Sequence, residues 1–130
     1  MLGLGLGLAL GGNAGNWPSW RGDLAGSGLA KGETVPLKWD TKKNVRWRVP
    51  LPDRGNSTPV VWGDKVFVTQ ATDADKRRTV MCFDKRTGEL LWRSGVTYSK
   101  AEKTHKTNPY CSGSPATDGR IVVANYASAG

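Results

Sequence analysis

An internal repeat is the feature that most constrains the fold of this chain. The segment 57–68, STPVVWGDKVFV, aligns with 113–123, GSPATDGRIVV, when one residue is deleted. Repeats with periods of about 20 to 50 residues are typical of proteins built from stacked copies of one supersecondary unit. The spacing between the two copies is slightly longer than this, and the polar, lysine-rich segment 99–110 between them accounts for the extra residues. The repeat therefore predicts one complete structural unit followed by the start of a second.

Short alternating stretches predict β-strands, and no stretch has the pattern of an amphipathic helix. Val45, Trp47 and Val49 alternate with arginines, which is typical of a half-buried strand. Four further strands are predicted at 57–62, 65–70, 78–83 and 89–96. Short antiparallel strands joined by tight turns form a meander, which is the unit of a β-propeller blade. We therefore predict an all-β fold made of four-stranded antiparallel blades.

The turn before the last of these strands has a distinctive sequence, Asp84-Lys-Arg-Thr87-Gly88. An aspartate can accept hydrogen bonds from amides two or three residues ahead, and a threonine can reinforce the turn. Gly88 can supply the positive φ that ends a short hairpin loop. Trp92 follows on the outgoing strand, where a large flat ring can cover a neighbouring sheet.

These residues resemble the quinoprotein-type, or PQQ-like, β-propeller repeat. The resemblance rests on the Pro-x-x-x-Gly run before each valine-rich strand, which follows Thr58 in the first repeat and Ser114 in the second, and on the run from Asp84 to Trp92. It implies that Asp84, Thr87, Gly88 and Trp92 form a tryptophan docking motif between blades. It also implies that residues 45–51 are an outer strand that closes the ring against the last blade.

The resemblance also predicts how the chain is organised. Residues 1–15 alternate Leu with Gly and then carry small residues, which predicts a signal peptide or, alternatively, a disordered glycine-rich tail. Residues 16–38 form an irregular lead-in, similar to the start of secreted bacterial members of the group. Residues 39–130 form a partial propeller, with a blade at 57–96 and the start of the next at 112–130. The chain would be an N-terminal fragment holding about one and a half blades of a ring of about seven or eight.

Charge and location limit the choice of partner. The net charge is +8, and the basic residues gather at 42–43, 76–78 and 85–86, where we place turns or strand ends. That distribution favours a solvated basic surface over a nucleic-acid site, although a polyanion-binding surface stays an alternative. The Leu/Gly segment is too short to span a membrane, so we expect a periplasmic or secreted protein that is not transmembrane.

The two cysteines, Cys82 and Cys111, show no metal-binding spacing. Cys82 is expected in the core, and Cys111 lies in a loop where it could be free; a disulfide between them remains open. PQQ-dependent dehydrogenases, as a family, use a vicinal cysteine pair over the quinone and calcium held by carboxylate and amide side chains. Neither pattern is visible, so the cofactor is unknown, and PQQ and calcium are implied by resemblance alone.

Two polar segments, 54–57 and 105–112, precede the first strands of the two repeats. The first strand of a propeller blade lies nearest the central channel, so both segments would meet at one mouth of that channel. The candidates for ligand contact there are Arg54, Asn56, His105, Asn108 and Tyr110. The alternative is loop polarity with no specific ligand.

No nucleophile elbow or phosphate-binding glycine loop is present, so no catalytic or metal-binding residue is predicted. We predict a non-catalytic binding or scaffold propeller whose partner is a protein or a carbohydrate. A PQQ-dependent dehydrogenase is the alternative within the same fold, because one propeller ring can host enzymes and scaffolds alike.

Overall fold

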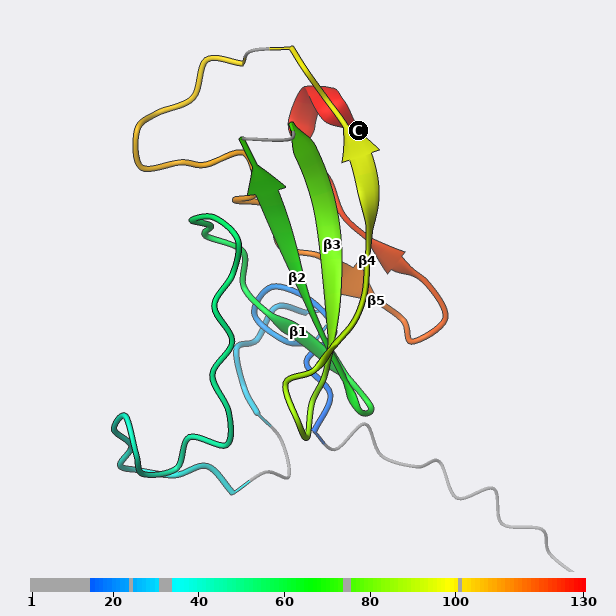
Figure 1. Ribbon diagram of the computed structural model, residues 1–130. Helices are drawn as coiled ribbons and strands as arrows, with labels where there is room; N and C mark the ends of the chain where they lie inside the picture. Colours follow the sequence, from blue (N-terminus) through cyan, green and yellow to red (C-terminus); the bar gives the residue numbers. More distant parts are fainter. Residues whose placement is uncertain (1–14, 24, 31–33, 74–75, 101) are drawn as a thin grey trace, which may run out of the picture.

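The computed structural model of the chain describes residues 15–23, 25–30, 34–73, 76–100 and 102–130, so residues 1–14 of the predicted signal peptide lie outside the described residues. A four-stranded antiparallel sheet has the order β1-β2-β3-β4, and a separate hairpin pairs β5 with β6 (Figure 1). The strands are β1 (Val60–Trp62), β2 (Lys65–Thr72), β3 (Arg77–Asp84), β4 (Leu90–Thr97), β5 (Ala116–Thr117) and β6 (Val122–Val123), followed by a 3-10 turn, η1 (Ala127–Ala129). The described residues contain no α-helix. The all-β prediction and the four-strand meander are confirmed.

The two repeats give matching hairpins, because β1–β2 and β5–β6 fold from the aligned segments. Each hairpin turns at a glycine with positive φ, Gly63 in the first and Gly119 in the second. The first hairpin is extended into a sheet by β3, which pairs with β2 over the full length of both strands. The second repeat therefore begins as the first does, as the alignment predicted.

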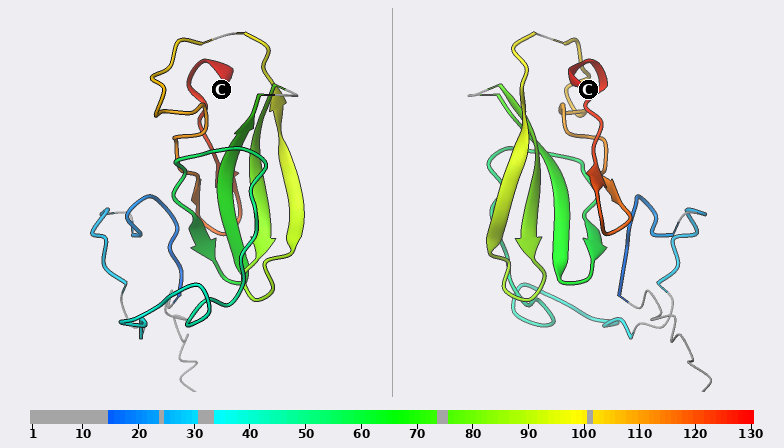
Figure 2. Two further views of the ribbon diagram at one scale, coloured as in Figure 1. Left: turned by 60° about the vertical axis from the view of Figure 1, so that its left-hand side comes forward. Right: turned by 90° about the vertical axis from the view of Figure 1, so that its right-hand side faces the viewer.

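Both faces of the four-stranded sheet are apolar. On one face the buried side chains of Val66, Val68, Met81 and Phe83 form a cluster. On the other face Val60, Phe67 and Cys82 form a second cluster, against which Val122 of β6 packs. Figure 2 shows the sheet lying between the 41–56 segment on one side and the β5–β6 hairpin on the other. Alternate side chains of β2 and β3 therefore pack into two cores, one on each face of the sheet, and neither face is left to solvent.

The strand predicted at residues 45–49 is not present as a paired strand in the structure. Its alternation instead directs Trp47 and Val49 onto the Val66–Phe83 face of the sheet. The Trp47 indole Nε1 donates a hydrogen bond of 2.9 Å to the carbonyl of Lys85. The period-2 pattern correctly indicated one apolar side, but no strand among the described residues lies beside this segment to pair with it.

The lead-in is anchored by Trp17. Its backbone N–H and carbonyl make hydrogen bonds of 2.7 and 2.8 Å with Val61, so residue 17 pairs with the edge strand β1. The carbonyl of Pro18 accepts a hydrogen bond of 2.9 Å from Thr117, which links the lead-in to the second hairpin as well. Trp20, by contrast, is 62% exposed and does not pack onto the domain as Trp17 does.

The Asp84 turn has the hydrogen bonds that its sequence predicts. Asp84 Oδ1 accepts from the backbone N–H groups of Arg86 at 2.8 Å and Thr87 at 2.7 Å, and from the Thr87 hydroxyl at 3.0 Å. These bonds to Thr87 hold the pKa of Asp84 below its ordinary value. Gly88 follows with φ of +78°, and its N–H donates to the Asp84 carbonyl. Hydrogen bonds among residues 84–88 therefore define the conformation of the turn independently of tertiary packing.

Gly88 also meets a second requirement, because the Trp47 ring lies against it. A Cβ added at Gly88 would stand 2.7 Å from the ring, whereas a Cβ at Gly63 would meet nothing within 4 Å. We expect Gly88→Ala to lower the free energy of unfolding by more than about 2 kcal/mol, and Gly63→Ala by only about 1 to 2 kcal/mol, which is the cost of positive φ alone. Urea unfolding followed by tryptophan fluorescence measures both. Equal losses would show that the Trp47 contact adds nothing.

Candidate functional site

The two polar segments predicted to share one mouth lie together in the structure. Asn56 Nδ2 donates a hydrogen bond of 2.9 Å to the carbonyl of Thr107, which joins the segments directly. The Cys111 thiol lies 3.6 Å from the Arg54 carbonyl. Gly55 lies so close to Cys111 that an added Cβ would be 2.9 Å from the sulfur. The approach of the two segments therefore depends on a small residue at position 55.

An open groove of about 430 Å³ lies at this end of the molecule. Three of the five predicted ligand-contact residues, His105, Asn108 and Tyr110, are among its lining residues. The other two are not: Asn56 holds the 105–112 loop in place, and Arg54 contributes its carbonyl to the contact with that loop. His105, Asn108 and Tyr110 thus lie in one groove, whereas Arg54 and Asn56 lie outside it and contact its loop.

The groove is lined by hydrogen-bonding groups on a hydrogen-bonded loop. His105 Nδ1 lies 2.8 Å from the Thr107 hydroxyl, and the carbonyl of His105 accepts from the backbone N–H of Asn108, also at 2.8 Å. The Ser112 hydroxyl donates to the Pro109 carbonyl at 2.7 Å. These bonds shape the loop and leave the imidazole and the Asn108 amide at an exposed surface. Such groups suit hydrogen bonding to a polar partner.

Tyr110 connects the groove to a buried arginine. Its hydroxyl donates to the carbonyl of Glu102 at 2.7 Å, and the guanidinium of Arg78 lies over its ring, 4.1 Å from the centroid. Arg78 is only 2% exposed. The expectation that the whole 76–78 basic cluster is solvated is therefore wrong for Arg78, because strand β3 turns this side chain inward while its neighbours remain at the strand end.

A buried cluster supports the groove from beneath. The hydroxyl of Tyr126 donates to the Thr79 carbonyl, and Tyr126 packs with the buried Cys111. The Thr69 hydroxyl donates to the Gly113 carbonyl at 2.6 Å and so fixes the chain just after the loop. Sequence reasoning did not single out Tyr126 or Thr69. Their bonding partners lie 47 and 44 residues away in the chain, so no local pattern marks them.

The comparison with family models gives a match over most of the chain. Residues 18–130 match the model described as outer membrane protein assembly factor BamB, a family of PQQ-like β-propeller repeats. The chain belongs to this family. No curated protein and no solved structure matched the chain. The all-β architecture of the described residues, a four-stranded antiparallel sheet and a hairpin, agrees with the β-propeller fold of this family.

The PQQ-like repeat implies PQQ and calcium, and the two cysteines do not supply the vicinal pair that the quinone site of those dehydrogenases uses. Cys82 is buried in strand β3 and Cys111 in the loop, both as free thiols, so they do not form a vicinal pair or a disulfide. Burial raises the pKa of both thiols. Among the described residues, no three His, Cys, Asp or Glu side chains gather as a metal site would require. No described helix is long and apolar enough to cross a membrane.

The buried Tyr126 gives a pH-dependent test of this cluster. Burial raises the pKa of Tyr126 to about 12, above its ordinary value near 10. The unfolded chain therefore releases this proton first, and the stability that Tyr126 contributes is complete below about pH 10 and lost as pH rises through about 12. We expect Tyr126→Phe to be less stable than the unaltered protein at pH 8, by about 1 kcal/mol.

Between pH 10 and 12 the two proteins should converge, because only the unaltered one loses the Tyr126 contribution. Urea unfolding at pH 8, 10 and 11 measures the difference, and the remaining tyrosines cancel between the two proteins. A difference in the free energy of unfolding that stays constant from pH 8 to pH 11 would contradict the burial of this hydroxyl.

Proposed function

We propose that this chain is part of a non-catalytic β-propeller scaffold of the bacterial periplasm. We also propose that the groove at the 105–112 loop, the loop-end groove, binds a protein of outer-membrane assembly. The observation that carries the proposal is the groove lined by His105, Asn108 and Tyr110, whose loop is held against Asn56. The family description, an outer membrane protein assembly factor, supplies the class of partner. The Leu/Gly start of the chain supports export.

A protein partner suits the groove better than a carbohydrate. Sugars usually bind against the open face of an aromatic ring, and Tyr110 is the aromatic residue at the predicted mouth. The guanidinium of Arg78 covers one face of that ring, and the Tyr110 hydroxyl is bonded to Glu102. The second aromatic residue of the lining, Tyr126, is buried. The other polar groups of the lining include the imidazole of His105, the amide of Asn108 and the charged side chains of Glu102 and Lys103, which match the donors and acceptors of a polypeptide.

We also propose that Asp84, Thr87, Gly88 and Trp92 serve as the docking motif between blades. The support is the contact that Trp47 makes with the same turn, with its ring on Gly88 and its Nε1–H bonded to the Lys85 carbonyl. Trp92 lies on β4 and is 39% exposed, which leaves its ring available for an equivalent contact with another blade.

Site-specific photo-cross-linking in the periplasm tests the partner. A benzophenone amino acid at position 108 lies in the groove, and one at position 86 lies in the β3–β4 turn at the opposite end of the sheet. We expect position 108 to cross-link to a component of the outer-membrane assembly machinery and position 86 not to do so. Replacing Asn56 by Ala, which removes the bond to Thr107, should reduce the yield at position 108 several-fold.

The proposal fails if position 108 gives no cross-link while the protein is exported and folded. It also fails if both positions give the same products in the same yield, because the groove would then contribute no selectivity.

A further inference from the structure

The hydrogen bonds inside the chain decide which groups of the loop-end groove are left for a partner. Asn125 lines the groove, and its Oδ1 accepts a hydrogen bond of 2.8 Å from the backbone N–H of Ala127. A backbone N–H can only donate, so this bond identifies the oxygen of the amide and leaves the Nδ2 group as the free end. Asn125 therefore offers donors to a partner.

His105 is arranged in the same way. Its Nδ1 lies 2.8 Å from the Thr107 hydroxyl and accepts a longer hydrogen bond, of 3.4 Å, from the Thr107 backbone N–H. Nδ1 is thus the unprotonated nitrogen of the neutral imidazole, and the proton is on Nε2. Because the side chain is exposed, this second N–H is available to a partner as a donor.

Positive charge exceeds negative charge around the groove. Lys103 lines it, and Lys100 and Lys106 lie in the same segment of the chain. Glu102 is the one acidic residue of the lining. The ammonium group of Lys103 adds three donors and no acceptor to those of Asn125 and His105.

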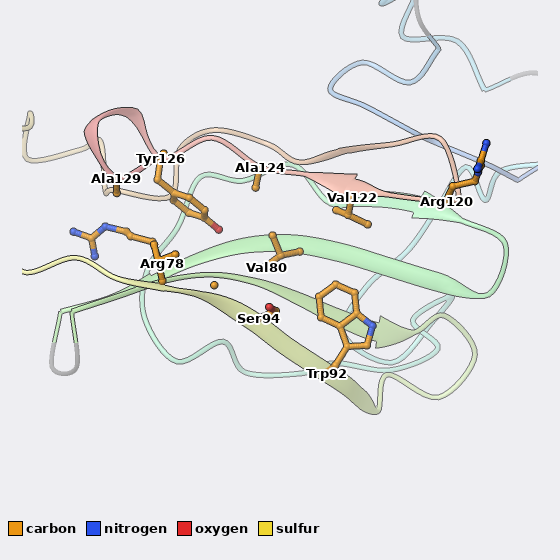
Figure 3. A pocket seen from close by; sticks show the side chains of 12 residues that line it. Arg78, Val80, Trp92, Ser94, Arg120, Val122, Ala124, Tyr126 and Ala129 are labelled. Atoms are coloured by element: carbon orange, nitrogen blue, oxygen red, sulfur yellow. The ribbon is translucent and has the colours of Figure 1, made fainter.

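A buried cation lies behind the groove. The stem of Arg78 lines a separate groove of about 510 Å³ between β3, β4 and β6, but its guanidinium points away from Trp92 (Figure 3). It stacks on Tyr110, 4.1 Å from the ring centroid, and Tyr110 lines the loop-end groove. Buried charges are screened less than exposed ones, so Arg78 adds to the positive potential at this end of the sheet.

Free donors and positive charge together favour an anionic group that only accepts hydrogen bonds. An ionised carboxylate is such a group, since its two oxygens accept and it has no proton to donate. Hydrogen bonds between a carboxylate and charged donors are also stronger than those between neutral groups. On a polypeptide, the side chains of aspartate and glutamate supply this group.

We propose that the loop-end groove binds an acidic segment of its partner protein, with an aspartate or glutamate carboxylate held among the donors of Lys103, His105 and Asn125. This inference rests on the proposed function, because it names the chemistry of the partner at the same groove. The Asn108 amide has both a donor and an acceptor, so it suits the peptide backbone beside the carboxylate.

Binding of a synthetic peptide to the full chain tests this proposal. The probe is a short rhodamine-labelled peptide of glycine and serine with a central Asp-Gly-Glu sequence and an amidated C-terminus. Its partner probe has Asn-Gly-Gln at the centre, so the two differ only in the side-chain carboxylates. By fluorescence anisotropy, we expect the acidic probe to bind at least about tenfold more tightly than the amide probe.

Asn125→Asp assigns this preference to the groove. It keeps the oxygen that bonds the Ala127 N–H and replaces the free donor by a carboxylate oxygen, so it should abolish the preference for the acidic probe. Asn16→Asp is the matched control. Asn16 Oδ1 also accepts a 2.8 Å bond from a backbone N–H, that of Gly63 in the β1–β2 turn at the other end of the sheet (Figure 1). This variant should keep the preference.

Glu102→Gln provides a change in the opposite direction. The Tyr110 hydroxyl bonds to the backbone carbonyl of Glu102, so replacing the side chain leaves that bond in place. Loss of the one carboxylate in the lining should make the acidic probe bind about two- to fivefold more tightly, and the amide probe should bind as before. A misfolded groove would not give a gain of this kind.

The proposal is overturned if the two probes bind equally or not at all, or if Asn125→Asp and Asn16→Asp reduce the preference to the same extent. If Asn125→Asp does not fold, as judged by circular dichroism, Lys103→Gln takes its place, with Lys85→Gln in the β3–β4 turn as its control. An acidic preference without cross-linking at position 108 would refute the proposed partner alone. Cross-linking without the preference would refute this inference alone.

Discussion

Both faces of the β1–β4 sheet are apolar, and the arrangement of the rest of the chain follows from the need to cover them. A sheet with one wet face folds with one covering layer, but this one requires two. Trp47 and Val49 cover one face from the segment before the sheet, and Val122 covers the other from the hairpin after it. The lead-in then ties the sheet to the hairpin, since Trp17 pairs with β1 and the Pro18 carbonyl accepts a hydrogen bond from Thr117 of β5.

The tryptophans and glycines of this chain act as pairs. Three tryptophan rings each lie against a glycine of positive φ, close enough that a Cβ would overlap or press on the ring. The pairs are Trp17 with Gly22, Trp47 with Gly88 and Trp62 with Gly119. A glycine that a turn already requires for its backbone leaves a flat, open patch, and an indole ring fills that patch with a large apolar area. Three of the six tryptophans are therefore matched to glycines that their turns require.

Sequence reasoning succeeded where the determinants are local. The Asp84 turn is fixed by hydrogen bonds within four residues, and the meander strands by alternation over about eight. It failed where the partner is distant. Alternation at 45–49 identifies an apolar side but not what lies beside it, so a packed segment was predicted as a strand. The inward turn of Arg78 was missed because a basic residue at a strand end is usually solvated.

The candidate sites differ in predictability for the same reason. Equivalence of the two repeats placed 54–57 beside 105–112 before any coordinates, because segments that precede equivalent strands in neighbouring blades meet at one end. It gave no information on the groove of about 510 Å³ that Val80, Trp92 and Val122 line, because these side chains come from β3, β4 and β6, which are distant from one another in the sequence. Arg78 lies between the two, since its guanidinium stacks on Tyr110 of the loop-end groove while its stem lines the other.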